Sequence, residues 1–161
     1  MAYEPRFYRQ WHETPDLVSF DVCIRETDLR VRAERDLRGR ATSLVERYRR
    51  DIEEYAAQHP EFLKALAPLP VPPKCPGIVE MMLRAGQAYG VGPMAAVAGA
   101  IAECVGMDLL AFSPQCIVEN GGDVFVRLNR AARLGLYAGK ESAFTGRLQI
   151  VVDATRGPVG V

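Results

Sequence analysis

The first part of the chain alternates apolar and polar residues as a half-buried β-strand does. Leu17–Ile24 is rich in Val, Phe and Ile, and Leu29–Glu34 alternates strictly between an aliphatic and a charged residue. These period-two patterns predict two strands, each with one face toward a core and the other toward water. The polar segment 25–28 between them predicts a turn, so we expect the two strands to pair as an antiparallel hairpin.

Three later segments have the apolar spacing of helices. Apolar residues recur every three or four positions from Leu37 to Tyr55, with Asp36 as the expected N-cap and a solvated Arg-rich opposite face. Ile78–Tyr89 predicts a second helix. Pro93–Val105 predicts a third, which begins with proline and should end at Gly106. This third helix is built from small and apolar residues on almost every face, which indicates a buried helix that a neighbouring backbone or a flat ligand can approach closely.

A proline-rich connector and a last group of strands complete the pattern. Residues 68–76 include five prolines, which cannot continue a helix and should form a stiff strap within one domain. Strands are expected at 115–119, 123–128, 134–138 and 148–153. Because runs of strands and runs of helices are separate, the chain predicts an α+β fold with antiparallel sheets backed by helices, as a single domain over residues 1–161.

Composition and charge narrow the function classes. Twenty Lys and Arg residues balance twenty Asp and Glu residues, so there is no positive field of the kind that nucleic-acid-binding proteins use. Apolar stretches are too short to span a membrane. Four cysteines without CxxC spacing, and an opening segment without an apolar leader, predict a cytoplasmic protein with reduced thiols. Cys104 and Cys116 lie in apolar runs and are expected to be buried.

Two glycine-containing segments are the candidates for a ligand site. Segment 90–95 is a Gly-Pro turn that leads into the third helix; its free N–H groups could bind an anion or simply start the helix. In segment 118–124, Glu119 and Asp123 flank Asn120-Gly121-Gly122. This segment could be a plain hairpin turn. Alternatively, it could present carboxylates and open backbone amides to the edge of a planar ring.

The ordered pair GVGPMAAVAGAIAE and VENGGDVFV resembles a bacterial and archaeal family related to the ApbE-like flavin transferases. The resemblance runs from about residue 4 to the end and includes the Arg6–Trp11 opening and Glu26–Leu29. It implies a fold akin to the tunnelling fold, a slot for FAD or FMN between the small-residue helix and the double-glycine turn, and transfer of FMN. The cofactor-binding candidates are Gly92, Pro93, Met94, Ala98, Gly99, Ala100, Ala102, Glu119, Asn120, Gly121, Gly122 and Asp123.

The resemblance also implies roles and a missing part. Glu119 would accept a hydrogen bond from the heterocycle, and Gly121 and Gly122 would let the backbone approach it. Flavin transferases hold magnesium with acidic and Thr ligands that lie largely in their C-terminal part, so the chain is expected to be a fragment whose magnesium ligands lie mostly outside it. Asp153 and Thr155 are compatible with a metal site, but a surface turn is the simpler interpretation. The catalytic and metal-binding residues stay unassigned.

Three hypotheses for the function remain open at this point. The first is a protein that binds a flavin or a similar flat heterocycle, with FMN transfer as its activity. The second is a non-catalytic scaffold of the same fold, whose partner is a second copy in a homo-oligomer. The third is a pterin-handling enzyme in which Glu119 anchors the ring. In none of them is the partner a nucleic acid or a membrane.

Overall fold

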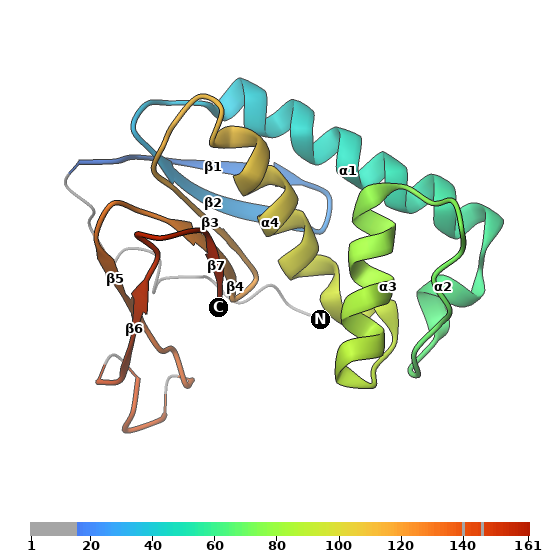
Figure 1. The fold of residues 1–161 in the computed structure, drawn as a ribbon. Coiled ribbons are helices and arrows are strands. Elements are labelled where there is room, and N and C mark those ends of the chain that lie inside the picture. The colour runs from blue at the N-terminus through green and yellow to red at the C-terminus, as the bar shows by residue number, and fades with distance from the viewer. Residues whose placement is uncertain (1–15, 140, 146) are drawn as a thin grey trace.

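A computed structural model describes residues 16–139, 141–145 and 147–161, and it has the expected α+β architecture (Figure 1). The Arg6–Trp11 opening lies outside these described residues. The elements, in chain order, are β1 (Val18–Ile24), β2 (Thr27–Ala33), α1 (Arg38–Gln58), α2 (Glu61–Lys64), α3 (Gly77–Tyr89), the 3-10 helix η2 (Pro93–Ala96), α4 (Val97–Leu109), β3 (Cys116–Asn120), β4 (Asp123–Arg127), β5 (Ala131–Gly135), β6 (Gln149–Asp153) and β7 (Val159–Gly160).

A five-stranded sheet is the centre of the fold. Its strand order is β1-β2-β3-β4-β7, and every neighbouring pair is antiparallel. A separate two-stranded sheet, β5-β6, is also antiparallel. The α1 and α4 helices cover one face of the large sheet (Figure 1). This arrangement confirms the predicted fold class.

The β1-β2 hairpin has a shorter turn than the polar segment suggests. Ile24 pairs with Thr27, so the turn itself consists of Arg25 and Glu26, and Arg25 adopts a positive φ of 53°. Thr27 and Asp28 belong to β2 and are buried. Strand pairing thus continues through Thr27 and Asp28, although the polarity of these two residues alone predicts a loop.

The first helix begins one residue later than the N-cap assignment implies. Leu37 occupies the N-cap position, while the Asp36 carboxylate accepts a hydrogen bond from the Arg38 N–H at 2.9 Å. The segment after His59-Pro60 forms the short helix α2. The α3 helix ends at Tyr89 as predicted, and the Gly90 that caps it adopts the left-handed conformation at φ 70°.

The third helix differs most from its prediction. Its first turn is the 3-10 helix η2, and α4 continues past Gly106 to Leu109. Gly106 does not end the helix. It lies within α4, at the point where this helix packs against β4. A Cβ at this position would lie 2.2 Å from the Phe125 ring, so the glycine lets the helix and the sheet pack closely.

The C-terminal strands were only partly predictable. The weak strand expected at 134–138 lies earlier, at β5, because Ala131–Gly135 pairs with β6. The two-residue strand β7 pairs with Phe125 and Val126 of β4. Its sequence follows a Gly-Pro pair and is too short for an alternation to show.

Two apolar clusters hold these layers together. The larger lies between the helices and the β1-β4 part of the sheet, and includes Phe20, Val45, Met82 and Val105. The smaller joins the opposite sheet face to the β5-β6 hairpin; its buried members are Ile117, Val126, Leu128, Ala132, Val152 and Ala154. Among the described helices, none alone is long and apolar enough to cross a bilayer; α3 with Pro93–Leu109 meets that length and composition only as a pair bent by 108°.

The free cysteines differ sharply in exposure, as the sequence predicts for two of them. Cys104 and Cys116 are buried, whereas Cys23 is exposed. Burial raises the pKa of the Cys104 thiol to about 11 and that of Cys116 to about 12. Both therefore stay protonated and unreactive near neutral pH.

We expect a maleimide at pH 8 to label Cys23 rapidly in the folded protein and Cys116 only after denaturant is added. Mass spectrometry of digested, time-quenched samples measures each site. Labelling of Cys116 at the same rate as Cys23 in the native protein would contradict the buried position.

Candidate functional site

The two segments singled out in the sequence lie in contact. The side-chain Nδ2 of Asn120, at the end of β3, donates a hydrogen bond of 3.0 Å to the backbone oxygen of Ala98 in α4. The Asp123 carboxylate lies beside Gly99, where a Cβ would be 3.4 Å from Oδ1. The Asn120 and Asp123 side chains occupy the space where the β3-β4 turn meets α4. The open space lies beside this contact.

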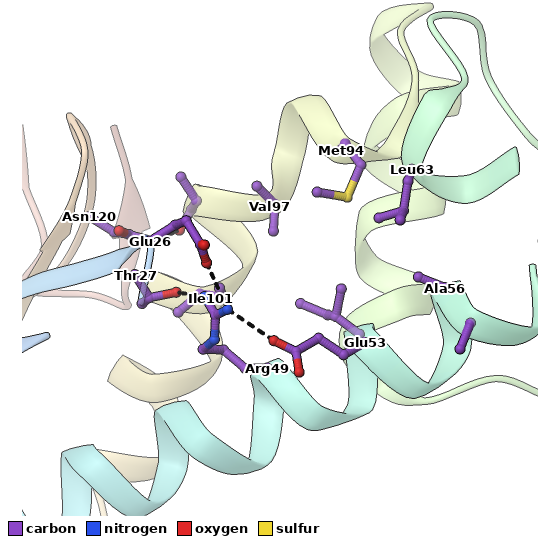
Figure 2. A pocket seen from close by; sticks show the side chains of 13 residues that line it. Glu26, Thr27, Arg49, Glu53, Ala56, Leu63, Met94, Val97, Ile101 and Asn120 are labelled. Carbon is purple, nitrogen blue, oxygen red and sulfur yellow. Dashed lines mark hydrogen bonds and ion pairs between the residues drawn. The ribbon is translucent and has the colours of Figure 1, made fainter. Parts of the chain in front are cut away.

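That open space is a cavity of about 610 Å³ between α1 and the start of α4 (Figure 2). Met94 and Ala98 line it from the predicted small-residue segment, and Asn120 lines it from the predicted turn. Its wall is mostly apolar, with Ile52 and Ile101 from the two facing helices. Small-molecule sites are commonly cavities of about 300–1,000 Å³ with apolar walls and a few polar groups.

One end of the cavity is polar and organised around Arg49 of α1. The guanidinium donates hydrogen bonds to Thr27 Oγ1 at 2.7 Å, to Glu26 Oε2 at 2.9 Å and to Glu53 Oε1 at 2.9 Å (Figure 2). Its side chain is only 14% exposed. The β1-β2 turn and α1 are therefore tied together at the rim of the cavity.

The remaining predicted residues lie elsewhere. Gly92 and Pro93 are buried, and the Gly92 N–H donates to the Leu66 oxygen at 3.0 Å. Ala100 and Ala102 are buried in the larger core. These four residues hold the loop and helix in place and do not line the cavity.

Glu119, Gly121 and Gly122 line a different cavity, of about 310 Å³. It lies on the opposite face of the sheet, because side chains alternate along β3 and Asn120 faces the helices. Glu119 Oε1 also accepts a hydrogen bond from the Gly122 N–H at 3.2 Å, which closes the turn. The structure thus brings together Met94, Ala98 and Asn120, and separates them from Glu119 and the two glycines.

Arg49 is the main cavity residue that sequence reasoning missed. It lies in an Arg-rich face that the interleaved acids marked as solvated, and its pairing with Glu53 four residues later fits that interpretation. The β1-β2 turn covers it. The resemblance around Glu26–Leu29 was the one signal in the sequence that pointed to this corner of the molecule.

Asn120→Ala should lower the free energy of unfolding by about 1–3 kcal/mol. The substitution removes a buried amide group together with its hydrogen bond to Ala98, and it leaves a cavity where β3 meets α4. Asn129→Ala, at an exposed position, is the control and should stay within about 0.5 kcal/mol of the parent. Urea denaturation measures both; equal stability of the two variants would show that the helix-turn contact contributes nothing.

The residues that the structure describes do not assemble a magnesium site. Asp153 Oδ1 accepts hydrogen bonds from the Thr155 N–H at 3.0 Å and from Thr155 Oγ1 at 2.6 Å, and these bonds hold the pKa of Asp153 below its ordinary value. The pair therefore forms a closed turn at the end of β6. Within the described parts of the chain, no three His, Cys, Asp or Glu side chains converge as metal ligands do.

Comparison with known proteins gives the family. A family model described as "AbpE bacteria" matches residues 9–161, and the chain belongs to that family. It is similar to UPF0280 proteins of archaea. It is 37% identical to the Methanopyrus kandleri protein, an alignment that covers 88% of this chain and 58% of the relative. It is 41% identical to the Methanothermobacter thermautotrophicus protein, in an alignment that covers 87% of this chain and 54% of the relative.

A third relative, from Methanocaldococcus jannaschii, is 38% identical over 79% of this chain and 51% of its own length. The chain thus spans about half the length of the curated relatives it matches. The names of these relatives state a family and no ligand or reaction.

Proposed function

We propose that the chain binds a flat heterocycle of the flavin class in the cavity between α1 and α4. The observation that supports this most strongly is the joint lining of one cavity by Met94 and Ala98 of the small-residue segment and by Asn120 of the turn. These are residues of the two segments on which the resemblance to flavin transferases rests.

The cavity suits a planar ring with one polar edge. Val97, Ala98 and Ile101 give an apolar wall of short and branched side chains against which a ring face can lie. Thr27 and Asn120 stand at the polar end, where a hydroxyl and an amide can meet the carbonyl and N–H groups of a ring edge. The apolar wall would thus contact the face of the ring, and Thr27 and Asn120 would orient the ring by hydrogen bonds to its edge.

FMN transfer, which the resemblance implies, is left out of this proposal. The described residues gather no magnesium ligands. The pterin hypothesis depends on Glu119, which lines the other cavity and is bonded within its own turn. The cavity between α1 and α4 therefore favours ring binding without assigning a reaction.

Fluorescence titration tests the proposal. Riboflavin, FMN, FAD and a pterin are each titrated with the protein while the emission of the ligand is followed. We expect saturable quenching by at least one flavin. A complete lack of saturation with every flavin would remove the proposed function and favour the scaffold hypothesis, which size-exclusion chromatography with light scattering then examines.

A further inference from the structure

The α1-α4 cavity has two chemically different ends. Figure 2 shows Ala56, Leu63 and Met94 together at one end, away from Thr27 and Asn120 at the other. The three residues of the first end come from α1, α2 and η2, which pack on one another there. Their side chains carry no oxygen and no N–H or O–H group. They therefore offer a ligand apolar contact alone.

The apolar end presents surface that a ligand would remove from water. Leu63 is 53% exposed, although its neighbour Phe62 is fully buried and holds α2 in place through an edge-on contact with the Tyr55 ring. Met94 is partly covered, and its unbranched thioether side chain adapts easily to an aromatic ring. Covering such side chains with an apolar part of a ligand is favourable, because apolar surface leaves water.

The flavin ring system has the same two-ended character as the cavity. Its three fused rings lie in a row, with the carbonyl and N–H groups of a pyrimidine ring at one end and a methylated benzenoid ring at the other. Pterins and lumazines keep the pyrimidine ring but lack the benzenoid ring. An apolar cavity end opposite a polar one therefore distinguishes the three-ring heterocycle from the two-ring ones.

We propose that the cavity binds a three-ring heterocycle in one orientation, with its pyrimidine ring at Thr27 and Asn120 and its benzenoid ring against Leu63 and Met94. This inference rests on the proposed function and adds which parts of the ligand each end recognises. The reverse orientation is disfavoured, because it would place the ring carbonyls against apolar side chains that cannot donate hydrogen bonds to them.

Two ligands that differ by the benzenoid ring test the inference. Riboflavin and dimethylribityllumazine share the pyrimidine edge and the ribityl chain, but the lumazine has no benzenoid ring. Riboflavin should bind roughly 10- to 30-fold more tightly, as expected when one more ring is buried against apolar side chains. Both compounds fluoresce, so titration of each with the protein gives the two dissociation constants.

Leu63→Asn tests the orientation. The substitution nearly keeps the size of the side chain but replaces its methyl groups with an amide, so riboflavin binding should weaken about 3- to 10-fold. Lumazine binding should stay unchanged, because that ligand lacks the ring at this end. Leu66→Asn is the matched control, since Leu66 is 91% exposed and does not line the cavity. Melting curves verify that both variants are folded, and the ligand pair tests the unmodified protein independently of them.

The outcomes separate the inference from the proposed function. Saturable riboflavin binding that is no tighter than lumazine binding would overturn the inference and leave the proposed function standing. A preference for riboflavin that a folded Leu63→Asn protein retains in full would overturn the orientation. If no flavin binds, both the proposed function and this inference are wrong.

Discussion

Gly92→Ala should lower the free energy of unfolding by about 3 kcal/mol or more. An added Cβ would lie 1.8 Å from the backbone oxygen of Ala65 and 2.6 Å from its carbonyl carbon. Those atoms belong to backbone and cannot rotate aside, so the two loops must separate and lose the hydrogen bond between Gly92 and Leu66. The melting temperature should fall by roughly 6–12 °C for a chain of this size.

Gly39→Ala is the matched control for this prediction. Gly39 lies in α1 with nothing within 4 Å of an added Cβ, and alanine favours helix, so stability should stay the same or rise by up to about 1 kcal/mol. Differential scanning calorimetry compares the two variants. A Gly92→Ala protein that melts with the parent would show that the close contact between the loops does not exist in solution.

Ala98→Phe should weaken flavin binding at least about 100-fold while the protein stays folded. Ala98 lines the cavity and is only partly covered, so a benzyl group can enter the space that the ring would occupy. Its backbone oxygen, which Asn120 holds, is unchanged. A 100-fold loss corresponds to roughly 3 kcal/mol of binding free energy.

Ala95→Phe is the control for this variant. Ala95 is exposed in η2 and does not line the cavity, so riboflavin should bind to this protein as to the parent. Fluorescence titration and melting curves of both variants decide the matter. Full binding by a well-folded Ala98→Phe protein would place the ligand somewhere else.

Regular patterns made most of the fold predictable. The strict alternation of Leu29, Val31 and Ala33 with charged residues correctly predicted a strand with one buried face, since all three are fully covered. The prediction that the helix ends at Gly106 was wrong, because a glycine can either end a helix or allow a neighbouring element to pack closely against it. Only the contact with Phe125 from β4 distinguishes the two, and that contact is absent from any local pattern.

The candidate site was predictable in part, for the same reason. Alternation along β3 separates Asn120 from Glu119 on the two faces of the sheet, so their placement in different cavities follows from a rule that the sequence already contains. Arg49 could not be found this way. Its burial depends on Glu26 and Thr27, more than twenty positions earlier in the chain, which tertiary folding brings to α1.

The most direct test of the central claim is a titration of ¹⁵N-labelled protein with riboflavin, followed by amide chemical shifts. If the account holds, the shifts that saturate cluster at Thr27, Asn120 and the segment from Met94 to Ile101, around the cavity between α1 and α4. Shifts confined to Glu119, Gly121 and Gly122 on the other sheet face, or no saturable shifts at all, would contradict it.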